Sequence, residues 1–296
     1  MEKNKQTVLV SIIIPLYNKE QSIFNTIQSV LSQSYKNIEL IVIDDGSTDE
    51  SVKVVSSIED TRITLIRQTN HGVAYTRNRG VKESKGDYVL FLDADDYLYQ
   101  MGIESLLSFL NIFPNCEVVT GNYYTKSRKY KKKSCTLNKD QVLTNPFRYL
   151  WYNTWDIRLG SFIINRNSLI SKVPYFDPNI LIGEDVIFTD NIIQVCTVGY
   201  VPCNILDYNR NFSILSEKEV NIEKTYEWNI AFNNEINIYL KRIYYDKIFR
   251  KIIKSILKLN LLFSIKLITK YWKVSYKILF FFFKRRIENI YFPFTH

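Results

Sequence analysis

The feature that most constrains the fold of this chain is the alternation of apolar, β-branched runs with helical segments through the first 92 residues. Buried strands are expected at residues 8–14, 38–43, 63–67 and 87–92, and helices at residues 18–33, 47–58 and 72–84. Asn18 is expected to cap the first helix, and Ser47 or Thr48 the second. Continuous apolar runs are typical of parallel strands covered on both faces, so the pattern predicts an open α/β sheet. The same pattern predicts two further strands, at 117–121 and 161–164, and a helix at 184–195.

Acidic residues follow two of the expected strands. Asp44 and Asp45 follow the strand at 38–43, and Asp93, Asp95 and Asp96 follow the strand at 87–92. Extended backbone would point Asp93 and Asp95 the same way, and carboxylates gathered in this manner repel one another unless a cation lies between them. Oxygen ligands without His or Cys suit Mg²⁺ or Mn²⁺, and Mg²⁺ binds through one or two carboxylates together with substrate phosphates. The sequence therefore predicts a site for a metal and a diphosphate, with helix capping and turn formation as the alternative.

Four segments carry a family resemblance: VSIIIPLYN at 10–18, ELIVIDDGSTD at 39–49, GVAYTRNRG at 72–80 and GDYVLFLDADD at 86–96. In this order and spacing they resemble the family 2 inverting glycosyltransferases of GT-A fold. The resemblance is strong over residues 8–97, weaker to about residue 216 and absent beyond. It implies a GT-A nucleotide-sugar-binding domain over residues 1–220, an open sheet flanked by helices, followed by a helical tail over residues 221–296.

The resemblance also assigns roles to individual residues. Those implied to bind the donor are Pro15, Tyr17, Asp44, Arg77, Asp93 and Arg210. Within this set, Tyr17 would lie near the base and Asp44 would accept a hydrogen bond from uracil. Asp95 would bind the metal ion, Mn²⁺ or Mg²⁺, and Asp96 could share it. Packing beneath the site remains the alternative for Arg77, and a structural salt bridge the alternative for Arg210.

A second acidic pair, Glu184 and Asp185, begins the expected helix at 184–195. An inverting transfer needs a base that takes the proton of the attacking hydroxyl group. The family pattern places this base at Asp185, with Glu184 as its neighbour. The alternative is that both acids only favour the positive end of the helix dipole.

Basic residues are concentrated in two regions. Residues 241–296 hold 14 Lys or Arg and 2 Asp or Glu, whereas residues 1–240 hold 25 and 28. At helical spacing the tail separates lysines from a broad aromatic and aliphatic face, a pattern typical of a helix at a membrane surface, with packing on the body or in a dimer as the alternative. Residues 126–133 contain six basic side chains in eight. A solvated loop is expected there, and contact with phosphate or lipid headgroups is the second interpretation.

Together these features predict a glycosyltransferase, hexosyl- or N-acetylhexosaminyl-, that moves one sugar from a UDP-sugar to a hydroxyl group of a glycan acceptor. The basic, aromatic tail suggests a polyprenyl-linked acceptor, as in bacterial capsule or other surface polysaccharide synthesis. A cytoplasmic protein held on the inner face of the cell membrane, on anionic lipid, is expected, and no nucleic acid partner. The alternatives are a sugar-nucleotide pyrophosphorylase, whose Gly-rich loop is missing here, and a non-catalytic nucleotide-sugar-binding or scaffolding subunit of a membrane complex.

Overall fold

The computed structural model describes residues 8–126, 131–151, 155–180 and 183–209 of the 296-residue chain. The chain divides into two compact units, residues 1–144 with 157–217 and residues 145–156 with 218–296. In the second unit the described residues form one helix, α5 (Pro146–Trp151). The expected tail at 221–296 and Arg210 lie outside the described residues, so the tail, its boundary at residue 220 and the role of Arg210 stay predictions.

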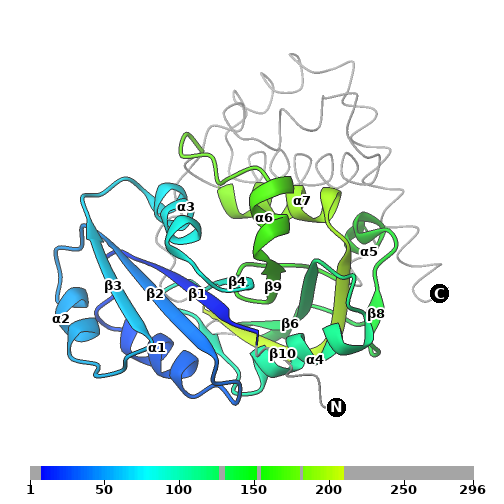
Figure 1. The fold of residues 1–296 in the computed structure, drawn as a ribbon, viewed down its shortest axis with the longest axis horizontal. Coiled ribbons are helices and arrows are strands. Elements are labelled where there is room, and N and C mark those ends of the chain that lie inside the picture. Colours follow the sequence, from blue (N-terminus) through cyan, green and yellow to red (C-terminus); the bar gives the residue numbers. More distant parts are fainter. Residues whose placement is uncertain (1–7, 127–130, 152–154, 181–182, 210–296) are drawn as a thin grey trace, which may run out of the picture. The chain divides into compact units, whose positions relative to one another are not determined.

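A large mixed sheet forms the first unit (Figure 1). Its strands are β1 (Val10–Leu16), β2 (Ile38–Asp45), β3 (Ile63–Gln68), β4 (Tyr88–Phe91), β5 (Tyr97–Leu98), β6 (Val118–Lys126), β7 (Lys131–Lys133), β8 (Gln141–Val142), β9 (Phe162–Asn165) and β10 (Val198–Asn209). The order is β3-β2-β1-β4-β9-β6-β10-β5, with β7 paired to β6 and β8 to β10. Strands β1 to β4 are parallel, β9 is antiparallel to both β4 and β6, and β10 is parallel to β6. Strands β1 to β4, β6 and β10 therefore all end at the same edge, which we call the carboxyl edge.

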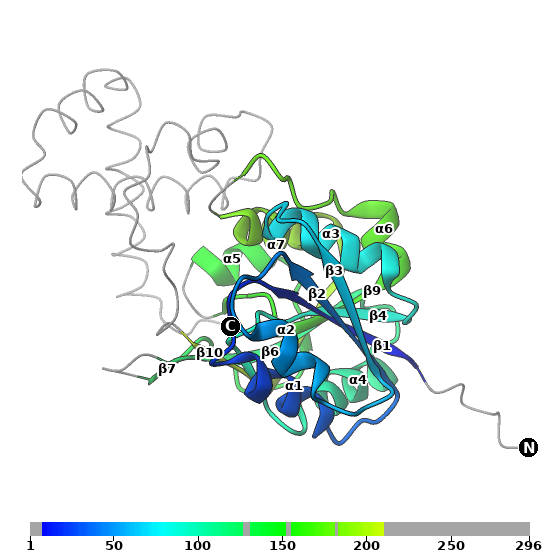
Figure 2. The same ribbon diagram turned by 90° about the vertical axis from the view of Figure 1, so that its left-hand side faces the viewer.

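Helices cover both faces of this sheet (Figures 1 and 2). They are α1 (Ile23–Leu31), α2 (Ser51–Ser56), α3 (Val73–Glu83), α4 (Gly102–Ile112), α6 (Arg166–Lys172) and α7 (Glu184–Val195). On one face, Ile12 of β1 belongs to the same buried cluster as Ile27 of α1 and Leu106 of α4. On the other, α3 packs so closely on β1 that a Cβ atom on Gly80 would lie 2.3 Å from Cγ2 of Ile13. The strands are thus buried on both sides, which explains their continuous apolar sequences.

The expected α/β sheet is confirmed, with strand ends shifted by at most five residues and the helix at 184–195 correctly bounded. The capping expectations are wrong. Asn18 adopts a left-handed φ of 50° four residues before the N-cap, Ser22, and its Oδ1 accepts a hydrogen bond of 2.8 Å from the backbone N–H of Thr48. Ser47 in turn accepts one of 3.1 Å from the backbone N–H of Asn18. These side chains join two loops at the carboxyl edge instead of starting helices.

Candidate active site

Asp44 and Asp45, at the end of β2, are both buried and both hold loops in place. Oδ1 of Asp44 accepts a hydrogen bond of 3.0 Å from the backbone N–H of Ser47, and its Oδ2 lies 3.7 Å from Nε of Arg67. Asp45 accepts hydrogen bonds from the backbone N–H groups of His71 at 2.9 Å and Gly72 at 2.8 Å. Asp45 thus fixes the loop that leads into α3, a role that the sequence did not indicate. The contact of Asp44 with uracil stays a prediction.

The two residues expected to line the nucleotide pocket lie at the end of β1. Pro15 pairs with Ile43 in the ladder between β1 and β2 and is partly exposed. Tyr17 follows the strand, and 47% of its surface is exposed. Its ring is therefore accessible at the carboxyl edge, where a nucleotide base could stack on it.

Arg77 connects the two acidic regions. Its side chain is only 4% exposed and forms ion pairs with Asp93 at 2.8 Å and Glu184 at 2.9 Å. Burial favours a lower pKa for the guanidinium group, but the two carboxylates outweigh it and raise that pKa above its ordinary value. The neighbouring Asn78 forms hydrogen bonds of 2.7 and 3.0 Å with the backbone of Phe176 and so anchors a loop. Arg77 therefore holds together the residues expected on the donor and acceptor sides.

The chain turns at Asp93–Asp96, and the expectation of extended backbone there is wrong. The backbone N–H of Asp96 donates a hydrogen bond of 3.1 Å to the carbonyl of Asp93, so Asp93 and Asp95 take different partners. Asp93 pairs with Arg77, whereas Oδ2 of Asp95 lies 2.5 Å from Nζ of Lys19. Burial raises the pKa of Asp95 although Lys19 opposes the effect. Lys19 is a counter-charge that the sequence reasoning missed, because it lies 76 positions from its partner.

Asp96 points into the protein interior. Its surface is only 2% exposed, and its Oδ1 accepts a hydrogen bond of 2.8 Å from the backbone N–H of Asn209 in β10. Burial, followed by the charge of Asp93, raises its pKa well above the ordinary 3.8. The Asp96 carboxyl group thus lies in the interior, whereas 35% of the Asp93 side chain and 13% of the Asp95 side chain are exposed.

This placement makes a prediction about pH. Because the pKa of Asp96 is raised by folding, its contribution to stability is complete below pH 3.8 and is lost as pH rises through the raised pKa. Asp96→Asn keeps the acceptor for Asn209 but cannot ionise. In EDTA it should be more stable to urea than the parent at pH 7, and the difference should disappear toward pH 4.

Asp60 provides a control of opposite sign, since hydrogen bonds from Arg62 lower its pKa to about 2. Asp60→Asn should therefore lose stability relative to the parent at pH 7 and approach it as pH falls toward 2. If the urea midpoints of the parent and of Asp96→Asn differ by the same amount at every pH from 4 to 7, the proposed interior position of the Asp96 carboxyl group is contradicted.

The second acidic pair lies in the first turn of α7. Glu184 is largely buried, and burial raises its pKa although Arg77 opposes the effect. Asp185 is partly exposed, and its Oδ1 accepts a hydrogen bond of 2.9 Å from the backbone N–H of Val186. The helix is held in place by Phe188, whose ring stacks on Phe176 at 3.8 Å. Of the two carboxylates, Glu184 is thus held by Arg77, whereas Asp185 accepts a hydrogen bond from the backbone of its own helix.

The carboxyl edge offers hard oxygen ligands for a divalent ion. In the described part of the chain, no three His, Cys, Asp or Glu side chains form a group suited to hold a metal. Two carboxylates are nevertheless enough for Mg²⁺ when substrate phosphates and water complete its coordination. Asp93, with 35% of its side chain exposed, and Asp95 fit that requirement, provided that Asp95 releases Lys19.

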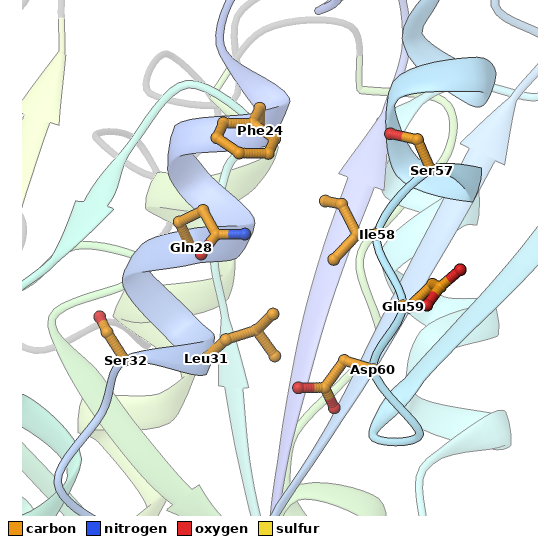
Figure 3. Close-up of a pocket in the computed structure, with 8 residues that line it drawn as sticks. All are labelled: Phe24, Gln28, Leu31, Ser32, Ser57, Ile58, Glu59 and Asp60. Carbon is orange, nitrogen blue, oxygen red and sulfur yellow. The ribbon is translucent and has the colours of Figure 1, made fainter.

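A shallow pocket of about 480 Å³ lies elsewhere, between α1 and the segment after α2 (Figure 3). The residues that line it are Phe24, Gln28, Leu31, Ser32, Ser57, Ile58, Glu59 and Asp60. None of the predicted site residues is among them, so this pocket is separate from the candidate active site.

Comparison with known proteins identifies the family. Residues 11–173 match the family described as glycosyl transferase family 2. The chain belongs to this family. The described fold is its GT-A fold, and the chain contains a glycosyltransferase domain. Of the solved structures, that of TarS 1–349 from S. aureus with UDP-GlcNAc matches 80% of this chain and 69% of its own, with a TM-score of 0.67 and 21% identity.

Curated relatives match between 34% and 79% of this chain. An uncharacterized glycosyltransferase of Haemophilus influenzae is 46% identical over 119 residues, which are 39% of this chain and 47% of the relative. The Escherichia coli enzyme WfaP, a UDP-Glc:alpha-D-GlcNAc-diphosphoundecaprenol beta-1,3-glucosyltransferase, is 45% identical over 103 residues, 34% of this chain and 41% of WfaP. EpsJ of Bacillus subtilis is 28% identical over 264 residues, 79% and 75% of the two chains. The matches thus span less than half of the first two relatives.

Proposed function

We propose that this chain transfers a single sugar, with inversion, from a UDP-sugar to a hydroxyl group of a lipid-linked glycan in bacterial surface polysaccharide synthesis. The observation that carries the proposal is Arg77, which joins the acidic turn after β4 to the acidic start of α7 by ion pairs of 2.8 and 2.9 Å. Support for the donor comes from TarS, solved with UDP-GlcNAc, and support for the acceptor from WfaP, named for a diphosphoundecaprenol substrate.

In the proposed reaction, Asp185 acts as the base. Its carboxylate takes the proton of the acceptor hydroxyl group while that oxygen attacks the anomeric carbon, and the bond from this carbon to the nucleotide diphosphate breaks. Tyr17 and Asp44 bind the uracil ring of the donor. Asp93 and Asp95 would hold a divalent ion, Mn²⁺ or Mg²⁺. When bound, that ion neutralises charge on the leaving diphosphate. Glu184 forms an ion pair with Arg77 and so holds the start of α7 close to Asp93.

The experiment that tests this function is a donor hydrolysis screen of the full chain with UDP-, GDP- and dTDP-sugars, followed by transfer to lipid-linked acceptors. We expect hydrolysis of a UDP-sugar that accelerates when an acceptor is added. Nucleotide binding without turnover on any donor or acceptor would favour a non-catalytic binding or scaffolding subunit. Release of pyrophosphate from UTP and a sugar 1-phosphate would favour a pyrophosphorylase.

The proposed metal role makes a prediction for Asp95. Asp95→Asn keeps the size of the side chain but removes the charge, so it should weaken the Mn²⁺-dependent binding of UDP by about 10-fold or more, the worth of one hydrogen bond to a charged group. Calorimetry with Mn²⁺ and with EDTA measures this effect. Asp96→Asn is the matched control and should keep the metal dependence. If EDTA leaves UDP binding by the parent unchanged, the metal proposal is wrong.

We also propose that the basic, aromatic tail at 221–296 holds the protein on the inner face of the cell membrane. None of the described helices is long and apolar enough to cross a bilayer. The proposal rests on the lysine arcs and the aromatic run of the sequence, at residues 247–258, 266–284 and 280–283. An interfacial helix gains about 1 kcal/mol from each Lys near anionic lipid, a term that salt weakens, whereas apolar burial persists.

The full chain should therefore sediment with phosphatidylglycerol vesicles, and high salt should release only part of it. A variant that ends near Asn237 should lose sedimentation and keep donor hydrolysis. If the truncated variant is insoluble and inactive, or if the full chain does not sediment with vesicles, we would conclude that the tail packs on the rest of the protein or in a dimer.

A further inference from the structure

A basic β-hairpin lies at the carboxyl edge of the sheet. Lys126 ends β6, and the ladder places Lys131 of β7 directly opposite Lys126, with Lys132 and Lys133 following. Lys126 and Lys133 are exposed, and neither forms an ion pair with any residue that the structure describes. The expected solvated loop at 126–133 is thus partly wrong, because both of its flanks are paired strands.

The ladder connects this hairpin to the acidic turn. β10 runs parallel to β6 and pairs Asn209 with Lys126, one strand spacing of about 5 Å away. The backbone N–H of Asn209 donates the hydrogen bond of 2.8 Å to Asp96, the last residue of the acidic turn. β6 thus lies between β7 and β10 in the sheet. The hairpin therefore begins next to the candidate active site, at the edge where ligands of open α/β sheets bind.

The charges of the hairpin call for an anion. The register pairs Lys133 with Tyr124, so the exposed Lys126 and Lys133 are diagonal neighbours on one face of the ladder. Like charges on neighbouring positions of a sheet destabilise it, so an anion that binds at Lys126 and Lys133 would stabilise the hairpin. The donor diphosphate does not fill this role, because the proposed function assigns it to the ion at Asp93 and Asp95. A second phosphate group must then come from the other substrate.

We infer that Lys126 and Lys133 of this hairpin bind the phosphate groups of the acceptor, a glycan attached to its lipid through a diphosphate. This inference rests on the proposed function and names the part of the acceptor that the chain recognises. A hairpin that only contacted anionic headgroups would need no connection to the acidic turn, whereas recognition of an acceptor requires one.

The experiment measures the affinity of the full chain for decyl diphosphate N-acetylglucosamine by calorimetry, with UDP at saturation so that the donor site is filled. Decyl N-acetylglucosaminide, which lacks phosphate, is the matched probe. The hairpin variant carries Lys126→Gln, Lys131→Gln and Lys133→Gln. The body variant carries Lys36→Gln, Lys82→Gln and Lys85→Gln, three exposed lysines elsewhere, and so has the same net charge. A third variant replaces the three hairpin lysines with Arg.

We expect the hairpin variant to bind the diphosphate probe about 10-fold more weakly or worse, as expected for loss of hydrogen bonds to charged groups. Its affinity for the phosphate-free probe and its hydrolysis of UDP-sugar should match those of the parent. The body and Arg variants should bind the diphosphate probe like the parent. Equal weakening in the hairpin and body variants, or a parent that does not prefer the diphosphate probe, would overturn the inference.

A hairpin variant that lost only its sedimentation with phosphatidylglycerol vesicles would also overturn it and assign the hairpin to the membrane surface. Failure of the proposed function is separate, since it would appear as a parent that hydrolyses no nucleotide sugar. The comparison of the two probes would still decide the role of the hairpin.

Discussion

Asp185→Asn should bind UDP-sugar like the parent and transfer sugar about 10²-fold more slowly or worse, the range for loss of a general base. The substitution keeps the shape of the side chain and the acceptor for the backbone N–H of Val186, so the first turn of α7 should stay intact. Only the ability to take the proton of the acceptor hydroxyl group is lost. Calorimetry with donor and initial rates with a saturating acceptor separate the two effects.

Glu184→Gln is the informative companion, because Glu184 is engaged with Arg77 at 2.9 Å and is not expected to touch the acceptor. It should keep the acid limb of the pH–rate profile, which Asp185→Asn should lose. Asp177→Asn, at an exposed acid before α7, should resemble the parent in every measurement. If Asp185→Asn is fully active, or if Glu184→Gln loses the acid limb of the pH–rate profile, Glu184 is the general base instead of Asp185.

Arg77→Met should destabilise the protein by about 3 kcal/mol, the lower range for removing one partner of a buried ion pair, because Asp93 is partly exposed. The cost arises from Glu184 and Asp93, which lose the cation that compensates their charges. Thermal or urea unfolding at pH 7 measures it. The same variant should also lose donor turnover, since the acidic turn and the start of α7 are no longer joined.

Two further variants show whether charge is the cause. Adding Glu184→Gln and Asp93→Asn to Arg77→Met removes the uncompensated charges, so most of the lost stability should return while turnover remains lost. Arg79→Met, two residues along the same helix, removes only a partly exposed pair with Glu83 at 3.8 Å and a hydrogen bond to Gln68, and should cost about 1 kcal/mol or less. Equal losses from Arg77→Met and Arg79→Met would contradict a connecting role for Arg77.

The sequence alone predicts the α/β sheet and most of its long strands. Residues such as Ile12 to Ile14 and Leu40 to Ile43 are apolar without interruption, and this local pattern is enough to predict strands buried on both faces. The helix of Glu184–Val195 agrees with the sequence at both bounds, and the acids of its first turn favour its N-terminus. α4, α6 and β10 were not predicted, and the capping role of Asn18 was wrong, since hydrogen-bonding side chains serve loops as readily as helix ends.

For the candidate site, the sequence supplied the acidic residues and their family roles, and tertiary structure supplied their partners. Arg77 meets Glu184 across 107 positions and Asp95 meets Lys19 across 76, and no local pattern encodes a contact between such distant residues. Burial likewise separated Asp96, which faces the interior, from Asp93 and Asp95, although the three are close together in the sequence. Residue types and strand ends are local properties that the sequence determines. Which charge faces which, and which faces water, depends on how the sheet brings its strands together, and only the folded chain decided it.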